Sequence, residues 1–438
     1  MKLSLRPYAL MISISLVVAV VPSVSGGQST SRSMTVQEAI RIAMTRAPEV
    51  LIAETQAARA KEAVRETRSL NRPQVFTGTG LAYNNGYPLS MEGAAPSIFQ
   101  LGASQAIFSK RNSNLINEAE EAGKASRLGA ETVRNELASR TALVYYELFK
   151  SRKIIDIASE RLQAAEQQQS LTETLLEGGR VLPVEVTKAR TAVSSTRQQL
   201  LIAKEQAMLA ESELRALTGI PDSVSIETIE PRIESPIFEL GSDALYRQVL
   251  ESSPEVLQAE ATLRAKQYHV EAEKGEAHPR AEIIGQYALF SKANNYDDFF
   301  NRFTRNNFII GLSLQVPIFN GFRTNARVAQ SRQEASEASH NLERIKANLK
   351  LRIERGSSAL RIARGAAELA HSDAEAAREM VKVSTTLLES GRIGPGDLEE
   401  ARGQLHQKEL AILDAEQLLY QRKLELLNAT GSITSLLD

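Results

Sequence analysis

Residues 308–319 read FIIGLSLQVPIF, a stretch with no charged side chain and a strict period of two. The large apolar side chains would share one face of an extended strand: Phe308, Ile310, Leu312, Leu314, Val316 and Ile318. The opposite face would carry Gly311, Ser313, Gln315 and Pro317. The stretch is long enough to cross a bilayer as a tilted strand, which takes about 9 to 11 residues.

Three other stretches have strand character. Residues 99–107 repeat the alternation with one miss at Gln105, and residues 74–83 and 281–290 precede the two alternating stretches across polar loops. A soluble, half-buried antiparallel sheet explains the alternation of any single strand equally well. Four strands cannot close a membrane barrel, which needs about eight, and lipid does not tolerate open sheet edges. A membrane barrel therefore requires two or more copies of the chain.

The rest of the chain is typical of long helices. Among its 438 residues the apolar fraction is 42%, aromatic residues make up 5%, and Trp is absent. Ala and Leu dominate the apolar residues, which favours helices in narrow contact over a large core. The 52 basic and 53 acidic side chains are interspersed, so the sequence has no electrostatic footprint for nucleic acid.

The N-terminus has the pattern of a secretory signal. Lys2 and Arg6 precede an apolar run at residues 9–21, and small residues follow at Ser23 and Ser25. The run is shorter than the roughly 20 residues of a spanning helix, which disfavours a membrane anchor. We expect a signal peptide over residues 1–25.

The chain contains two similar halves, which match at an offset of about 210 residues. We expect a first repeat over residues 33–219, a Pro-rich connector over 220–241, a second repeat over 242–431 and a tail over 432–438. Each repeat would begin with a helix (35–70 and 242–277) and continue through two strands into a long helix (111–177 and 322–388). A Gly-centred turn and a shorter returning helix would follow. The long helices would each extend about 100 Å.

The returning helices carry apolar residues at heptad spacing, which predicts side-by-side helix packing. In the first half every heptad position is apolar except Thr196, and in the second every one is apolar except Lys408 and Arg422. An ordinary antiparallel coiled coil would explain this pattern equally well if the strands were absent.

The ordered set of motifs resembles the TolC family of outer-membrane efflux channels over essentially the whole mature length. The resemblance rests on MTVQEAIRIAMTRAPEV near the start, GLSLQVPIFNGFR at the second strand-to-helix junction, and the turns EGGRVLPVEVTKAR and ESGRIGPGDLEEARG. It implies a homotrimer with twelve strands in one barrel. It also implies a helical tunnel that is closed at its periplasmic end until a pump complex engages it. The first junction departs from the second, since Ser109, Lys110 and Arg111 replace Asn320, Gly321 and Phe322.

The turns between the long and returning helices would lie farthest from the membrane. Gly179 and Gly391 end a helix, and Pro183 and Pro395 begin the next one. By resemblance, the acidic residues after each turn would narrow the entrance: Glu185, Asp397 and Glu400. Arg180 and Arg392 would contact the adaptor or pair with these acids. The simpler alternative is two plain hairpin turns, with acids that the helix dipole favours.

The sequence contains no pattern typical of catalysis, a metal site or a cofactor site. The five His residues lack ligand spacing, and we expect them scattered on the surface. We therefore expect a passive outer-membrane exit duct that extends into the periplasm and works with a periplasmic adaptor and an inner-membrane transporter. The alternative is the periplasmic coiled-coil adaptor itself, although an adaptor would carry one helical hairpin rather than two.

Overall fold

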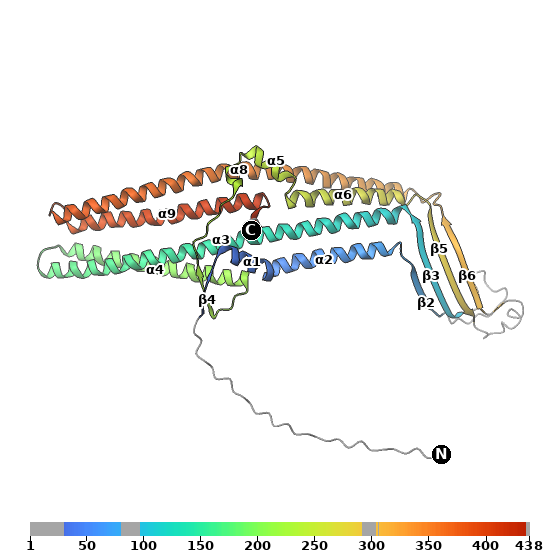
Figure 1. The fold of residues 1–438 in the computed structure, drawn as a ribbon, viewed down its shortest axis with the longest axis horizontal. Helices are drawn as coiled ribbons and strands as arrows, with labels where there is room; N and C mark the ends of the chain where they lie inside the picture. The colour runs from blue at the N-terminus through green and yellow to red at the C-terminus, as the bar shows by residue number, and fades with distance from the viewer. Residues whose placement is uncertain (1–29, 80–96, 291–303, 305, 435–438) are drawn as a thin grey trace, which may run out of the picture.

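The computed structural model describes residues 30–79, 97–290, 304 and 306–434. Figure 1 shows a long helical body that continues at one end into a small sheet. The expected fold class, mainly α with a small β part, is confirmed. The expected signal peptide and most of the two strand-connecting loops lie outside the described residues.

Two helices run the length of the body. Helix α3 (Lys110–Glu177) has 68 residues and α8 (Arg323–Glu389) has 67, which corresponds to about 100 Å each. Each turns back into a shorter helix, α4 (Pro183–Thr218) or α9 (Pro395–Ala429). The predicted long helices, turns and returning helices are therefore confirmed.

The opening helix of each half was expected to be continuous, and this was wrong. The first divides into α1 (Val36–Arg46) and α2 (Pro48–Ser69), and the second into α5 (Ser242–Leu250) and α6 (Pro254–Gly275). The cause is Pro48 and Pro254, because a proline ring disfavours helical backbone in the residue before it. Ala47 accordingly has φ −63° and ψ 132°. Each break separates a short helix from a longer one, and the longer ones pack along the long helices: α2 along α3, and α6 along both α3 and α8.

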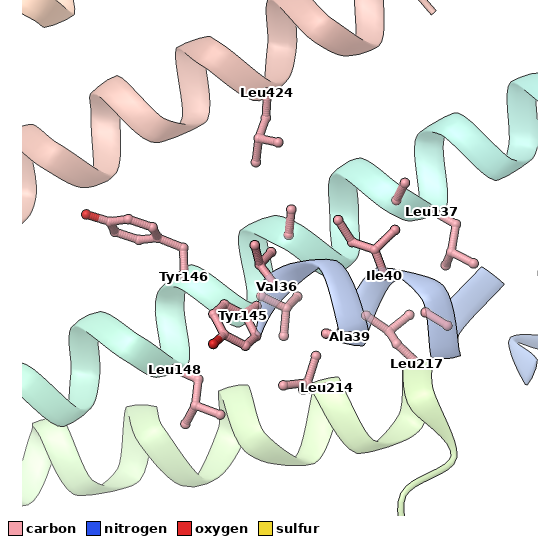
Figure 2. Close-up of a cluster of buried hydrophobic side chains, with 14 of the residues drawn as sticks. Val36, Ala39, Ile40, Leu137, Tyr145, Tyr146, Leu148, Leu214, Leu217 and Leu424 are labelled. Carbon is pink, nitrogen blue, oxygen red and sulfur yellow. The ribbon is translucent and has the colours of Figure 1, made fainter. Parts of the chain in front are cut away.

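The main core lies where α1 packs against α3 and α4 (Figure 2). Its side chains come mainly from α1, α3, α4 and α9, among them Ile40, Leu148, Leu214 and Leu424, and Val50 of α2 completes the cluster. A parallel pair of strands, β1 (Thr30–Met34) and β4 (Val224–Thr228), closes one side of the core. The connector that was expected to be extended thus contains β4 and a short 3-10 helix (Pro236–Glu239).

A buried tyrosine ties this small sheet to the helices. The Tyr145 hydroxyl donates to the Met34 carbonyl at 2.6 Å and accepts from the Ile229 backbone N–H at 2.7 Å. Burial raises the pKa of Tyr145 to about 12. The side chain therefore acts as a neutral link between α3, the N-terminal strand and the connector.

The four predicted strands form one antiparallel sheet. They are β2 (Gln74–Gly78), β3 (Ser97–Ser109), β5 (Arg280–Phe290) and β6 (Asn306–Gln315), in the order β2-β3-β5-β6. Strand β6 ends four residues earlier than expected. Pro317 has no N–H to donate to a ladder, which explains an end near this position.

The register places the apolar side chains of neighbouring strands on one face. Phe308 lies opposite Tyr287, which lies opposite Leu101, and Leu312 lies opposite Ile283. On the other face Ser313 lies opposite Glu282, and Gln315 opposite Arg280. Because neighbouring residues of a strand point to opposite faces, the sheet has one apolar face and one mostly polar face.

The polar face is not uniformly polar. The ring of Phe76 lies across Gly102 of β3, where an added Cβ would come within 2.2 Å of the ring. A β-bulge between Ala106 and Phe108 pairs Phe108, rather than Ile107, with Ala281.

The two strand-to-helix junctions differ, as the sequence indicated. Strand β3 continues directly into α3, whose first turn is capped by the Ser109 hydroxyl, which accepts from the Asn112 N–H at 3.1 Å. Residues 316–322 separate β6 from α8 and include a turn at Gly321 and Phe322. The first junction is therefore a direct passage and the second a bent segment.

Candidate functional site

Both Gly-centred turns lie at the end of the molecule opposite the sheet (Figure 1). In the first, the Arg180 N–H donates to the Leu175 carbonyl at 2.8 Å, and the Gly179 N–H donates to the Leu176 carbonyl at 2.9 Å. Gly179 has φ 67°. This is a Schellman motif, in which the left-handed position favours glycine.

The second turn has the same geometry. The Arg392 N–H donates to the Leu387 carbonyl and the Gly391 N–H to the Leu388 carbonyl, both at 2.9 Å, and Gly391 has φ 70°. Pro183 and Pro395 are the first residues of the returning helices, as expected. The two turns thus share one backbone conformation and differ in their side chains.

The three predicted acidic residues have different surroundings. Glu185 forms an ion pair with Lys188, one turn later in α4, at 2.9 Å. The Asp397 carboxylate accepts from the Gly394 N–H at 2.9 Å and so caps α9. Glu400 is exposed one turn farther along. Among the described residues, no hydrogen bond or ion pair joins Glu185 to Asp397 or Glu400.

Arg180 and Arg392 are both exposed. Within the described part of the chain, neither forms a salt bridge with the predicted acids. Their side chains therefore remain accessible at the tips of the two turns.

The first turn also presents an apolar surface that the sequence analysis missed. Leu182 is 68% exposed and Val184 is 50% exposed, one on each side of Pro183. The equivalent residues of the second turn are Gly394 and Gly396. The signal in the sequence was the Leu-Pro-Val triplet directly after a turn, where solvent-facing residues are usually polar.

One histidine was placed wrongly. His406 was expected on the surface, but it is 7% exposed and its Nε2 atom has no hydrogen-bond partner. It lies on α9 close to Arg161 of α3, whose guanidinium packs against Gly403. Burial, assisted by the Arg161 charge, lowers the pKa of His406 to about 4. Its burial could not be read from the sequence, because it depends on contact between the two halves.

The described residues contain no group of three His, Asp or Glu side chains that could hold a metal ion. Residues 39–220 and 245–432 match the family described as outer membrane efflux protein. The two matched stretches make up well over half of the chain. The chain belongs to the outer membrane efflux protein family. The family membership expected from the turn and junction motifs is confirmed.

Relatives in the outer membrane efflux protein family are distant in sequence. The chain is 23% identical to the outer membrane efflux protein BepC of Brucella suis over 70% of its own length and 66% of that protein. It is 28% identical to the pyoverdine export outer membrane protein OpmQ of Pseudomonas aeruginosa over 61% of its length and 54% of that protein. The chain thus spans about half to two thirds of the length of these curated relatives.

The fold of a solved outer membrane channel, CmeC of Campylobacter jejuni, is similar throughout. The TM-score is 0.77 at 16% identity, and the match covers 97% of this chain and 94% of that one. At this identity the likeness concerns the fold. Within the described part of the chain, no helix combines the length and the apolar character that a membrane span requires.

Proposed function

We propose that this protein is a passive exit duct in the outer membrane, through which substrates pass from the periplasm to the exterior. The observation that supports this proposal most strongly is the four-stranded sheet, which extends beyond the helices at one end of the molecule (Figure 1). On β6, Phe308, Ile310, Leu312 and Leu314 are 66 to 71% exposed on one face. In water, such a face and two open edges would promote aggregation. A lipid environment makes the same face favourable.

The strand count favours three copies. Lipid requires every backbone donor and acceptor to be paired, so the free edges of β2 and β6 must meet edges of other copies. Three chains would supply twelve strands in one barrel. This stoichiometry is the one implied by the resemblance to the TolC family.

Internal symmetry supports the same assembly. Within the chain, α9 packs against α3 through Tyr420, whose ring lies over that of Tyr146 with the ring centroids 4.4 Å apart. Tyr420 is only 5% exposed as a result. In the repeat, α4 corresponds to α9 and α8 corresponds to α3. A ring of copies would therefore reproduce the α3–α9 contact between chains, with α4 of one copy against α8 of the next. Met208, the equivalent of Tyr420, is 57% exposed.

Further apolar residues are exposed on these two helices, most of them one or two heptads apart, with Met380 one turn before Val383. They are Leu201, Ile202, Met208 and Leu209 on α4, and Ile362, Leu369, Met380 and Val383 on α8. Such rows fit the seam between neighbouring copies of the chain.

The turn end would form the periplasmic entrance. Three copies of Asp397 and Glu400, and with them Glu185, would become rings of carboxylates, which favour cations. Arg180 and Arg392 would contact a periplasmic adaptor, together with the apolar Leu182 and Val184. The adaptor would link the duct to an inner-membrane transporter that supplies the energy.

We propose that the inner-membrane transporter, rather than this chain, selects the cargo. The relative OpmQ is named for pyoverdine export, and another relative, FusA of Burkholderia cepacia, for fusaric acid resistance. These two names refer to chemically different compounds, and we propose passive conduction here without one dedicated cargo.

The test is electrical. The protein without residues 1–25 is purified in detergent, its mass in the complex is measured, and it is added to a planar lipid bilayer. We expect a trimer that produces small, discrete, cation-preferring current steps. A folded protein that stays monodisperse without detergent and never conducts would overturn the duct and favour the adaptor alternative.

A further inference from the structure

The polar face of the sheet carries a large aromatic side chain, Phe76 of β2. Phe76 lies opposite Gly102 of β3, and Gly102 lies opposite Gln286 of β5, so these three residues share one face. Although it lies against a neighbouring strand, Phe76 is 58% exposed. The aromatic ring therefore lies on the face that a membrane barrel would turn toward its lumen.

The ring of Phe76 lies flat over the neighbouring strand. A Cβ added to Gly102 would lie 2.2 Å from the Cζ atom of the ring and 2.5 and 2.7 Å from its two Cε atoms. Because these three distances are nearly equal, Gly102 meets the plane of the ring rather than its edge. The ring also leans over β3 and away from the free edge of β2. Pairing of that edge with another copy of the chain would therefore leave the outer face of the ring open.

The second half of the chain carries a polar pair at the equivalent place. Phe76 and Glu282 each lie three residues after the proline that precedes their strand, Pro73 or Pro279. Glu282 of β5 lies opposite Ser313 of β6, in the same relation as Phe76 to its glycine partner. The same strand pairing thus forms with a carboxylate and a hydroxyl. The sheet does not require an aromatic ring at this position.

Equivalent residues of the two halves would lie at one height in a closed barrel. A rotation about the barrel axis would superpose the first half on the second, and with it Phe76 on Glu282. The strand register contains a matching stagger, since Phe76 is level with Gln286, four residues beyond Glu282. Tilted strands in a barrel have such a stagger. Three copies would therefore alternate three phenyl rings and three carboxylates around the lumen.

The charges of the sheet are concentrated near this level. Arg280 and Glu282 are the only charged side chains of the four described strands. The Arg280 guanidinium donates to the side-chain oxygen of Gln315 at 2.7 Å. Within the described residues, no ion pair or hydrogen bond occupies the Glu282 carboxylate or the Gln286 amide. These two groups and the outer face of Phe76 are therefore available to a molecule in the lumen.

We propose that Phe76 and Glu282 form a lumenal collar, which binds aromatic organic cations transiently as they pass through the barrel. The aromatic part of such a molecule would stack on the phenyl face. Its positive charge would be attracted by the ring face and by the carboxylate. Gln286 would hydrogen-bond polar substituents. Weak binding is compatible with conduction, because a molecule must also leave the site.

The collar favours a class of compounds, while the transporter still selects the cargo. The proposal rests on the membrane barrel of the proposed function. Single-channel current tests it with three probes. Benzyltrimethylammonium carries a ring and a positive charge, tetramethylammonium carries the charge alone, and benzenesulfonate carries the ring with a negative charge. Each is added in the millimolar range to both sides of the bilayer, and the block of the salt current gives an apparent Kd.

We expect benzyltrimethylammonium to block at a lower concentration than the other two probes. Phe76→Leu keeps an apolar side chain without a ring and should raise the apparent Kd of benzyltrimethylammonium about two- to fivefold. Glu282→Gln should weaken the block by both cations. Phe308→Leu is the matched control, since it removes a ring from the opposite face of the sheet and should leave the block unchanged. Phe76→Tyr should retain the block.

The outcomes separate the collar from the duct. Equal block of the native protein and Phe76→Leu, with ordinary current in both, would overturn the collar and leave the duct in place. If Phe76→Leu does not fold, unchanged block in Glu282→Gln would overturn the collar. Block that weakens in Phe308→Leu instead would place the apolar face in the lumen and overturn the barrel. Absence of current from the folded trimer would overturn the duct, and the collar with it.

Discussion

The two helical hairpins share one backbone plan but are fastened differently. Arg197 of α4 pairs with Glu166 of α3 at 2.9 Å. At the equivalent positions of the second hairpin, Glu409 of α9 pairs with Arg378 of α8 at 3.3 Å. The acid lies on the long helix in the first hairpin and on the returning helix in the second, but the ion pair joins the same two positions. The two halves therefore share the geometry of the hairpin rather than the residues at these positions.

Nearer the turns the hairpins differ. Arg190 pairs with Glu173 across the first hairpin at 2.9 Å. Hydrogen bonds from Gln169 and Arg190 lower the pKa of Glu173. In the second hairpin Thr385 replaces the acid, and Arg402 pairs with Glu399 on its own helix. The last turns of the second hairpin thus lack this ion pair, and we expect them to be the more mobile part of the proposed entrance.

The largest expected effect concerns ion selectivity. Asp397→Asn combined with Glu400→Gln removes two charges per copy from the second hairpin, and an asparagine side chain can still cap α9. We expect the cation preference of single channels to fall severalfold, and Glu185→Gln in the first hairpin to change it less. Bilayer reversal potentials under a salt gradient measure both. Equal effects would show that the two hairpins contribute alike to the entrance.

The second prediction uses His406, whose equivalent in the first hairpin is the exposed Ser194. As pH falls below about 6.5, the unfolded chain takes up a proton at this histidine, whereas the folded chain does so only near pH 4. The free energy of unfolding should therefore fall by about 1.4 kcal/mol per pH unit within this window.

His406→Leu removes this titration and is the matched control. Between pH 7 and pH 5, the native protein should lose about 2 kcal/mol more stability than the variant. Denaturant unfolding of the detergent-solubilised protein at both pH values gives the difference. Parallel losses would mean that His406 is not held in its neutral form.

The third prediction tests whether the two turns are equivalent in backbone strain. Gly179→Ala and Gly391→Ala each force a side chain into the left-handed region and should each cost about 1 kcal/mol. Gly396→Ala is the control, since it lies in the first turn of α9 with negative φ and open space around it. It should stabilise the helix slightly. Denaturant midpoints measure all three, and a cost at one turn alone would contradict their shared geometry.

The smallest effect is expected for the ion pair near the first turn. Glu173→Gln should speed hydrogen exchange at the ends of α3 and α4 towards the rate at the second turn, with little change in global stability, since exposed pairs contribute little. Thr385→Glu places an acid at the equivalent position of the second hairpin and should slow exchange there. Unequal rates that persist in both variants would assign the difference to packing instead.

Much of the helical body could be predicted from local patterns. The long helices and turns followed from heptad spacing and from glycine and proline at fixed positions, because these signals act within a few residues. The break at Ala47 also has a local cause, since Pro48 disfavours helical backbone in the residue before it. The expectation of a continuous helix gave this effect of proline too little importance. The end of β6 near Pro317 has the same kind of cause.

Other features depend on partners that are distant in the sequence. His406 is buried because α3 lies against α9, and Tyr145 is a link because Met34 and Ile229 meet at its hydroxyl. The strand pair β1–β4 joins residues of the N-terminal segment to the connector. No periodicity in either segment specifies such a pairing, since each contact depends on the packing of the whole body.

The sequence by itself determined the two-fold repeat, the helical hairpins and a sheet with one apolar face. These follow from short-range periodicity and turn chemistry. Only the tertiary structure decided which hairpin is fastened near its turn, which histidine is buried, and how the Phe76 ring lies across Gly102. These depend on the distances between elements that the chain brings together only when it folds.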